Sequence, residues 1–158
     1  MSVERSVSRL SEVLFRFWDW VGYGPDEFSK DIFSCADAKE PFYFPEFSEM
    51  RKLCCDCENE LWSDREAEDY LTCMALDNEE ERILDHCAEN ASDKFVERIA
   101  LASLNHIQWH ARWQVAELLG RRNIPHWELF LEKLSRDPHP YVRQRAENVL
   151  KNPAPKLV

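Results

Sequence analysis

The last third of the chain repeats one helical pattern about 31 positions apart. Residues 106–119 read HIQWHARWQVAELL and residues 137–150 read DPHPYVRQRAENVL. With an offset of 31, Arg143 aligns with Arg112 and Leu150 aligns with Leu119. A period between about 20 and 50 residues is typical of helical arrays, in which each unit buries its apolar face only against its neighbours. The pattern therefore predicts stacked helix pairs.

The second copy resembles the HEAT repeat. It has an acid and a proline in the turn and a Val-Arg-x-x-Ala-x-x-x-Leu pattern on the following helix, carried by Asp137, Pro138, Val142, Arg143, Ala146 and Leu150. The resemblance covers residues 124–151 and extends less closely over 92–122. It implies a short right-handed α-solenoid that binds a macromolecule rather than turning over a small molecule. It also implies that Arg112 and Arg143 bond to turn acids such as Asp137.

The composition favours an all-α fold in a single domain of residues 1–158. The chain has only 3 Gly, and no stretch alternates polar and apolar residues as a half-buried strand does. With 44% hydrophobic and 12% aromatic residues, it can bury a continuous core. We expect roughly eight helices: an irregular N-terminal helical cap over 1–62, helix-pair repeats over 63–151, and a fraying tail over 152–158.

Local signals place most of the helix ends. A first helix over 3–21 should end at Gly22, and the Pro-fenced aromatic segment 41–45 should form a loop across the first pair. Ser63 and Ser92 have the character of N-caps. The helix pairs are expected at 64–90, 92–121 and 124–151, with inner helices near 108–120 and 140–151. The core stripe of the first inner helix should be Ile107, Ala111, Val115, Leu118 and Leu119.

The cysteines do not have the spacing of a structural zinc site. Cys54 and Cys57 lie three apart on the apolar face of one expected helix, where buried cysteines act as small hydrophobic residues. A zinc site would instead need ligand pairs on separate turns. His106 and His110 lie four apart without a third ligand nearby in the sequence. We therefore expect no metal, no disulfide and no cofactor, and the 3 Gly leave little room for a phosphate-binding loop.

The net charge of −10 is unevenly distributed. Residues 1–90 hold 9 Lys and Arg against 23 Asp and Glu, whereas residues 91–158 hold 11 against 7, so −14 and +4 sum to −10. An acidic surface repels nucleic acids and membranes and attracts basic proteins. Because 12 carboxylates fall within residues 58–89, we expect a contact surface there, formed by Glu58, Glu60, Glu66, Glu68, Asp69, Glu80, Glu81 and Asp85.

Trp109 and Trp113 are further candidates for the contact surface. They lie four apart beside the core stripe of their helix, and Trp is enriched in binding hot spots. The alternative interpretation is that both indoles pack between neighbouring helix pairs.

The sequence favours a non-enzymatic module that binds a basic protein. By physical type it is similar to the acidic bacterial immunity proteins that neutralise a toxin or nuclease. The alternatives are a HEAT-like DNA-binding enzyme of the glycosylase type, using Trp109, Trp113, Arg112, Arg121 and Arg122, and a HEAT-type scaffold or chaperone. No apolar run is long enough to span a membrane, and the N-terminus does not look like a signal peptide, so a cytoplasmic location is expected.

Overall fold

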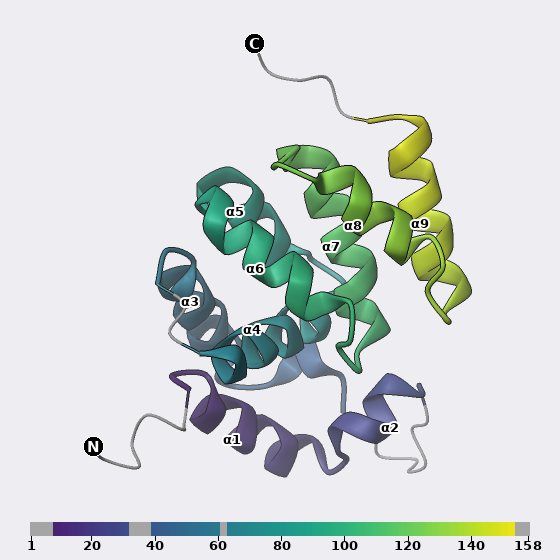
Figure 1. The fold of residues 1–158 in the computed structure, drawn as a ribbon. Helices are drawn as coiled ribbons and strands as arrows, with labels where there is room; N and C mark the ends of the chain where they lie inside the picture. The colour runs from purple at the N-terminus through teal and green to yellow at the C-terminus, as the bar shows by residue number, and fades with distance from the viewer. Residues whose placement is uncertain (1–7, 32–38, 61–62, 154–158) are drawn as a thin grey trace.

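The computed structural model describes residues 8–31, 39–60 and 63–153. Across these ranges the chain is helical and has no strand, which confirms the all-α prediction (Figure 1). The helices are α1 Ser11–Val21, α2 Pro25–Ser29, α3 Phe47–Cys57, α4 Asp64–Leu76, α5 Arg82–Asn90, α6 Asp93–Ser103, α7 Trp109–Arg122, α8 Trp127–Leu134 and α9 Pro140–Lys151, with a 3-10 turn at Pro41–Tyr43. The short helix α2 is an addition to the elements expected from the sequence.

The helix ends that the sequence predicted at Ser63, Ser92 and Gly22 are present in the structure. The hydroxyl of Ser63 accepts a hydrogen bond from the Glu66 amide at the start of α4, at 3.2 Å. Ser92 caps α6 in the same way. Gly22 ends α1 with a φ of 83°, a left-handed conformation that glycine adopts without strain.

Helix α7 is the central element of the fold. It contacts α4, α5, α6, α8 and α9, and Figure 1 shows it between the N-terminal helices and the yellow α9. Its residues Ala111, Val115, Leu118 and Leu119 are fully buried. Gly120 lets α9 approach closely, since an added Cβ would lie 2.7 Å from Val149 Cγ1. A helix enclosed on most of its sides places much of its sequence in the core.

The 31-residue repeat appears in hydrogen bonds as well as in sequence. Arg112 Nη1 donates to the backbone carbonyls six and five residues before it, at 2.6 and 3.2 Å. Arg143 Nη1 donates to the carbonyls at the same two offsets, at 2.6 and 3.0 Å. Both arginines therefore fold the turn that precedes their own helix. The right-handed solenoid remains a prediction.

One core prediction is wrong at the start of α7. The helix begins at Trp109, so Ile107 lies in the preceding turn with 47% of its surface exposed. The rest of the predicted stripe on α7 is buried. Residues 3–7 of the first predicted helix and residues 154–158 of the predicted tail lie outside the described residues.

Candidate functional site

Three of the predicted contact carboxylates lie inside the protein. Glu58, Glu66 and Asp69 are only 1%, 1% and 6% exposed. Their assignment to a binding surface is therefore wrong. A count of acidic residues along the sequence cannot distinguish a carboxylate that faces solvent from one that turns inward to a partner.

Each of these buried carboxylates has partners within the chain. Arg9 Nε lies 2.7 Å from Glu66 Oε1. The hydroxyls of Ser8 and Ser11 donate to the same oxygen of Asp69. These contacts hold the start of α1 and the residues just before it against α4, and they offset the cost of removing a charge from water.

The remaining predicted carboxylates differ in how far their side chains are exposed. Glu60 and Glu68 are exposed, whereas Glu80 and Glu81 are partly buried at the turn before α5. Asp85 is exposed and pairs with Arg121 at 2.9 Å, so part of the charge of the acidic half is compensated by the basic half.

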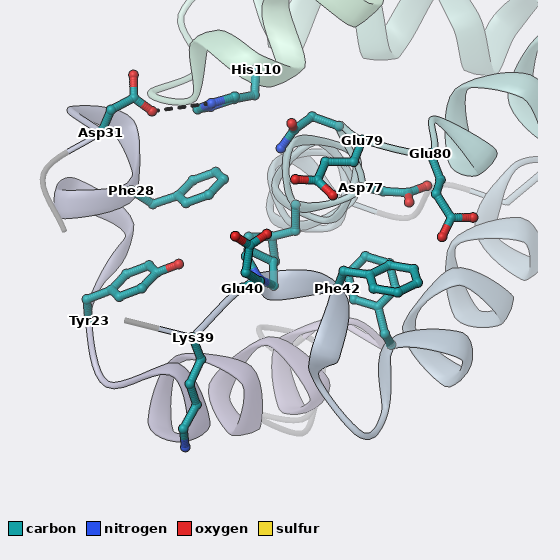
Figure 2. Close-up of a pocket in the computed structure, with 14 residues that line it drawn as sticks. Tyr23, Phe28, Asp31, Lys39, Glu40, Phe42, Asp77, Glu79, Glu80 and His110 are labelled. Atoms are coloured by element: carbon teal, nitrogen blue, oxygen red, sulfur yellow. Dashed lines mark ion pairs between the residues drawn. The ribbon is translucent and has the colours of Figure 1, made fainter. Parts of the chain in front are cut away.

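A pocket of about 310 Å³ gathers acidic and aromatic side chains (Figure 2). Its walls come from the α2 region, from residues 39–42 and 47, and from the connection between α4 and α5. Aromatic rings are provided by Tyr23, Phe28, Phe42 and Phe47, and carboxylates by Asp31, Glu40, Asp77, Glu79 and Glu80. The lysine among the described lining residues is Lys39, which extends away from the pocket in Figure 2 and donates to the Trp20 carbonyl.

The carboxylates of the pocket differ in how far they are neutralised. Asp77 is buried, receives hydrogen bonds from Arg51 and from the Ile83 amide, and is the most compensated of the five. Glu40 and Glu79 are exposed and form no ion pair among the described residues. These two side chains therefore keep an uncompensated negative charge at the pocket.

Trp109 contributes to this pocket indirectly. Its indole N–H donates to Asp31 Oδ2 at 3.2 Å, and its ring stacks on His139 with centroids 4.0 Å apart. His110 Nε2 lies 3.4 Å from the other oxygen of Asp31. Burial lowers the pKa of His110 to about 4, so at neutral pH this imidazole is uncharged and leaves the negative charge of Asp31 in place.

Trp113 is a packing residue. It is 5% exposed, and its ring meets Tyr141 edge-on at 5.6 Å and the Arg145 guanidinium at 5.0 Å. Its predicted role in partner binding is therefore wrong, and the alternative interpretation, packing between helices, holds for this residue. Trp113 joins α7 to the first half of α9, whereas Gly120 meets α9 at Val149, near its end.

A second hollow of about 660 Å³ lies along α1 and α4. It has exposed apolar side chains at Phe15 and Ile107, and Glu68 lies at its wall. Among the described residues, three acids in its lining face two arginines, Arg16 and Arg65, whereas five acids face one lysine in the first pocket. The first pocket is consequently the more negative of the two.

The sequence analysis missed several of the residues that line the first pocket. Tyr23, Phe28, Asp31 and Glu40 come from the irregular part of the chain, where no periodic pattern indicated which side chains would meet. The available signal was the aromatic cluster at 41–45 with an acid directly before it. This cluster indicated a loop that folds across the first helices, but it did not identify which residues of the loop and of the helices face each other.

The arginines considered for nucleic-acid binding already pair with acids of the same chain. Arg112 pairs with Asp137 at 2.7 Å and Arg122 with Asp93 at 2.8 Å. Arg121 pairs with Asp85 as described above. Because these guanidinium groups are compensated, they offer little positive charge to phosphates.

One set of side chains has the composition of a metal site. Among the described residues, Cys55, Glu58 and His86 bring one potential ligand atom each to within 4.8 Å of the others. Cys54 and Cys57 are fully buried in the core, as the spacing predicted. His106 lies before α7 rather than on it, so it does not share a helix face with His110.

Within the described residues, no helix is both long and apolar enough to cross a membrane. No protein-family model, no curated protein and no solved structure matches the chain. The chain can therefore be assigned a function only from its own residues.

Proposed function

We propose that this protein is a non-enzymatic module that binds a basic protein and receives one of its Lys or Arg side chains in the acidic, aromatic pocket. The observation that carries the proposal is the pair of uncompensated carboxylates, Glu40 and Glu79, beside the rings of Tyr23, Phe28 and Phe42. An inhibitor of the immunity type, which neutralises a basic toxin or nuclease, would use such a surface.

The chemistry of the pocket suits a cationic side chain. A guanidinium or ammonium group gains from pairing with carboxylates and from lying over the face of an aromatic ring. Arginine does both at once because its planar group stacks while its N–H bonds point to the acids. The pocket volume of about 310 Å³ is at the lower limit of small-molecule sites, about 300 Å³, and so favours a single side chain.

The charge of the whole chain supports the same class of partner. A net charge of −10 attracts a basic protein over a distance of about one Debye length and repels phosphate backbones. Such attraction raises the association rate, which benefits an inhibitor that must bind its target before the target acts.

In this proposal, stacked helix pairs form the scaffold that supports the pocket. We take α4–α5, α6–α7 and α8–α9 as three HEAT-like pairs, because the last two share the 31-residue register of Arg112 and Arg143. A stack of pairs would hold the pocket on a rigid support at its N-terminal end.

The proposal is tested by capture followed by kinetics. Proteins retained by the immobilised wild type are identified by mass spectrometry, and the binding rates of each purified candidate are measured at low and high salt. Glu40→Lys with Glu79→Lys should lower the association rate at low salt by about tenfold or more, because the reversal removes the steering field at the pocket.

A matched control separates the pocket from total charge. Glu132→Lys with Glu147→Lys produces the same change in net charge at exposed positions on α8 and α9. This control should bind almost as fast as the wild type. Partners that are acidic, or partners equally sensitive to both double variants, would contradict the proposed role of the pocket.

A further inference from the structure

The end of α3 and the first turns of α5 bring together a thiol, a carboxylate and an imidazole. Cys55 lies in the last turn of α3, and Glu58 follows as its C-cap. His86 reaches the same point from α5, with Nδ1 2.6 Å from Glu58 Oε2. One side-chain atom of each of the three lies within 4.8 Å of the other two.

We infer that Cys55, Glu58 and His86 form a binding site for a borderline-soft divalent cation of the zinc type, with at least one coordination position open to solvent. Sulfur, imidazole nitrogen and carboxylate oxygen are the three donor types that bind Zn²⁺ in proteins. A site built from three protein ligands leaves the fourth tetrahedral position for water or another small ligand.

The geometry is close to what such an ion requires. Bond lengths of roughly 2.0–2.3 Å place neighbouring ligand atoms about 3.3–3.8 Å apart in a tetrahedral site. The three atoms here lie within 4.8 Å of one another, and His86 Nδ1 and Glu58 Oε2, which are 2.6 Å apart, would separate slightly to admit an ion. The i, i+3 spacing of Cys55 and Glu58 directs both side chains to the same side of the helix end.

A fixed outer partner orients the carboxylate. The buried hydroxyl of Tyr70, on α4, donates to Glu58 Oε1 at 3.0 Å and leaves Oε2 on the side of His86. Hydrogen bonds of this kind hold metal-binding carboxylates in place. Glu58 is nearly fully buried, whereas Cys55 and His86 are partly exposed, so an ion reaches the site from solvent.

Protons compete with the ion at this site. Burial, helped by the carboxylates of Glu58 and Asp56, raises the pKa of the Cys55 thiol to about 11. A divalent cation has to displace this thiol proton, as metal ions do when they bind cysteine.

The linear sequence did not indicate this set because only two of its members are close in the chain. The pair Cys54 and Cys57 attracts attention by its spacing, yet both thiols are fully buried among apolar side chains. Cys55 lies on the other side of α3, toward α5, and its imidazole partner is brought to it by folding.

Cobalt is the probe that tests the site directly. Reduced protein, treated with a chelator and freed of it, is titrated with Co²⁺ while the thiolate-to-cobalt charge-transfer absorption is recorded. The wild type should develop this band and saturate at one ion per chain. Cys55→Ala should abolish the band, and His86→Ala should weaken the affinity by about tenfold or more.

Controls keep the result independent of folding. Both variants alter partly exposed side chains, and far-UV circular dichroism verifies that the helices form. His126→Ala, at an exposed imidazole before α8, should bind cobalt like the wild type. Zinc should raise the melting temperature of the wild type and of His126→Ala, but not that of Cys55→Ala.

Two results would overturn the assignment. One is the absence of the charge-transfer band in the wild type at equimolar cobalt. The other is an unchanged band in Cys55→Ala, which would place the thiolate ligand at a different cysteine. In either case the contact between Glu58 and His86 would be only a structural hydrogen bond between the end of α3 and α5.

Discussion

Asp137 accepts two hydrogen bonds from the guanidinium group of Arg112, at 2.7 Å from Nε and 3.1 Å from Nη2. The same carboxylate accepts the amide of His139 at 2.9 Å and so shapes the turn before α9. Both charged side chains are largely removed from solvent. This pair therefore ties α7 to the turn of the following helix pair, as the HEAT resemblance implied.

Removal of Asp137 should destabilise the fold strongly. In Asp137→Ala the Arg112 charge stays largely buried without its partner, and we expect a loss of about 3 kcal/mol in the free energy of unfolding, near the lower limit for breaking a buried pair. Asp64→Ala is the control, because its ion pair with Arg98 is exposed and should contribute about 0.5 kcal/mol or less. Urea denaturation measures both, and similar losses would contradict the importance of the Arg112–Asp137 pair.

Gly120 should resist replacement by alanine although it lies within a helix. Helix propensity alone favours alanine by about 1 kcal/mol, but the added Cβ would lie 2.7 Å from Val149 Cγ1. We expect Gly120→Ala to lower the free energy of unfolding by roughly 1–3 kcal/mol through overpacking. The double variant Gly120→Ala with Val149→Ala should be more stable than the sum of the two single losses predicts. Strict additivity would mean that α7 and α9 are not in close contact at this point.

The helix pattern of α9 and most of α7 could be predicted because it depends on spacing within one helix. Val142 and Ala146 are fully buried, as the Val-Arg-x-x-Ala pattern indicated. Ile107 was assigned incorrectly because periodicity identifies a helix face but does not identify the residue at which the helix begins. The indole of Trp109 donates a hydrogen bond to Asp31, which is far away in the sequence. The spacing of residues within α7 cannot predict such a partner.

The acidic segment shows a second limit of sequence analysis. The number of carboxylates in this segment can be counted from the sequence, but the count does not show which of them are buried. The burial of Glu58, Glu66 and Asp69 depends on partners from other elements. Arg9 and Tyr70, for example, come from before α1 and from α4. The pocket carboxylate Glu40 was missed for the same reason, because its neighbours are set by tertiary contacts.

His106 should make the fold less stable as the pH falls from 6.5 toward 4. Burial lowers its pKa from 6.5 to about 4 and outweighs the hydrogen bond between Nε2 and the backbone carbonyl of Glu68, at 3.1 Å. The backbone N–H of Gln108 donates a hydrogen bond to His106 Nδ1 at 3.1 Å. Because Nδ1 can accept this bond only when it carries no proton, the contact favours the neutral ring. The unfolded chain therefore binds a proton near pH 6.5, whereas the folded chain binds it only near pH 4.

The sign and size of the effect follow from linkage. Between these two pH values only the unfolded state gains from protonation, so the free energy of unfolding falls, by up to roughly 3 kcal/mol. His106→Gln should flatten the decline between pH 7 and 4.5, and the part that remains includes His110 and His139, because burial also lowers the pKa of both, that of His110 to about 4. Urea denaturation across this range measures the slope. His126→Gln, at an exposed position, is the matched control, and an equal slope in wild type and His106→Gln would refute the assignment.

Phe42 should affect how long the partner stays bound rather than how fast it binds. Its ring forms part of the pocket wall and is partly exposed, so it can lie against the aliphatic and cationic parts of an inserted Arg or Lys. Short-range contacts of this kind act mainly on dissociation, whereas the charges of Glu40 and Glu79 act mainly on association. Phe42→Ala should therefore raise the dissociation rate of the captured partner by about fivefold to tenfold, with the association rate unchanged. Phe15→Ala removes an exposed ring from the second hollow, outside the pocket, and should leave both rates unchanged. If Phe15→Ala accelerates dissociation and Phe42→Ala does not, the partner is held along α1 and α4 instead of in the acidic pocket.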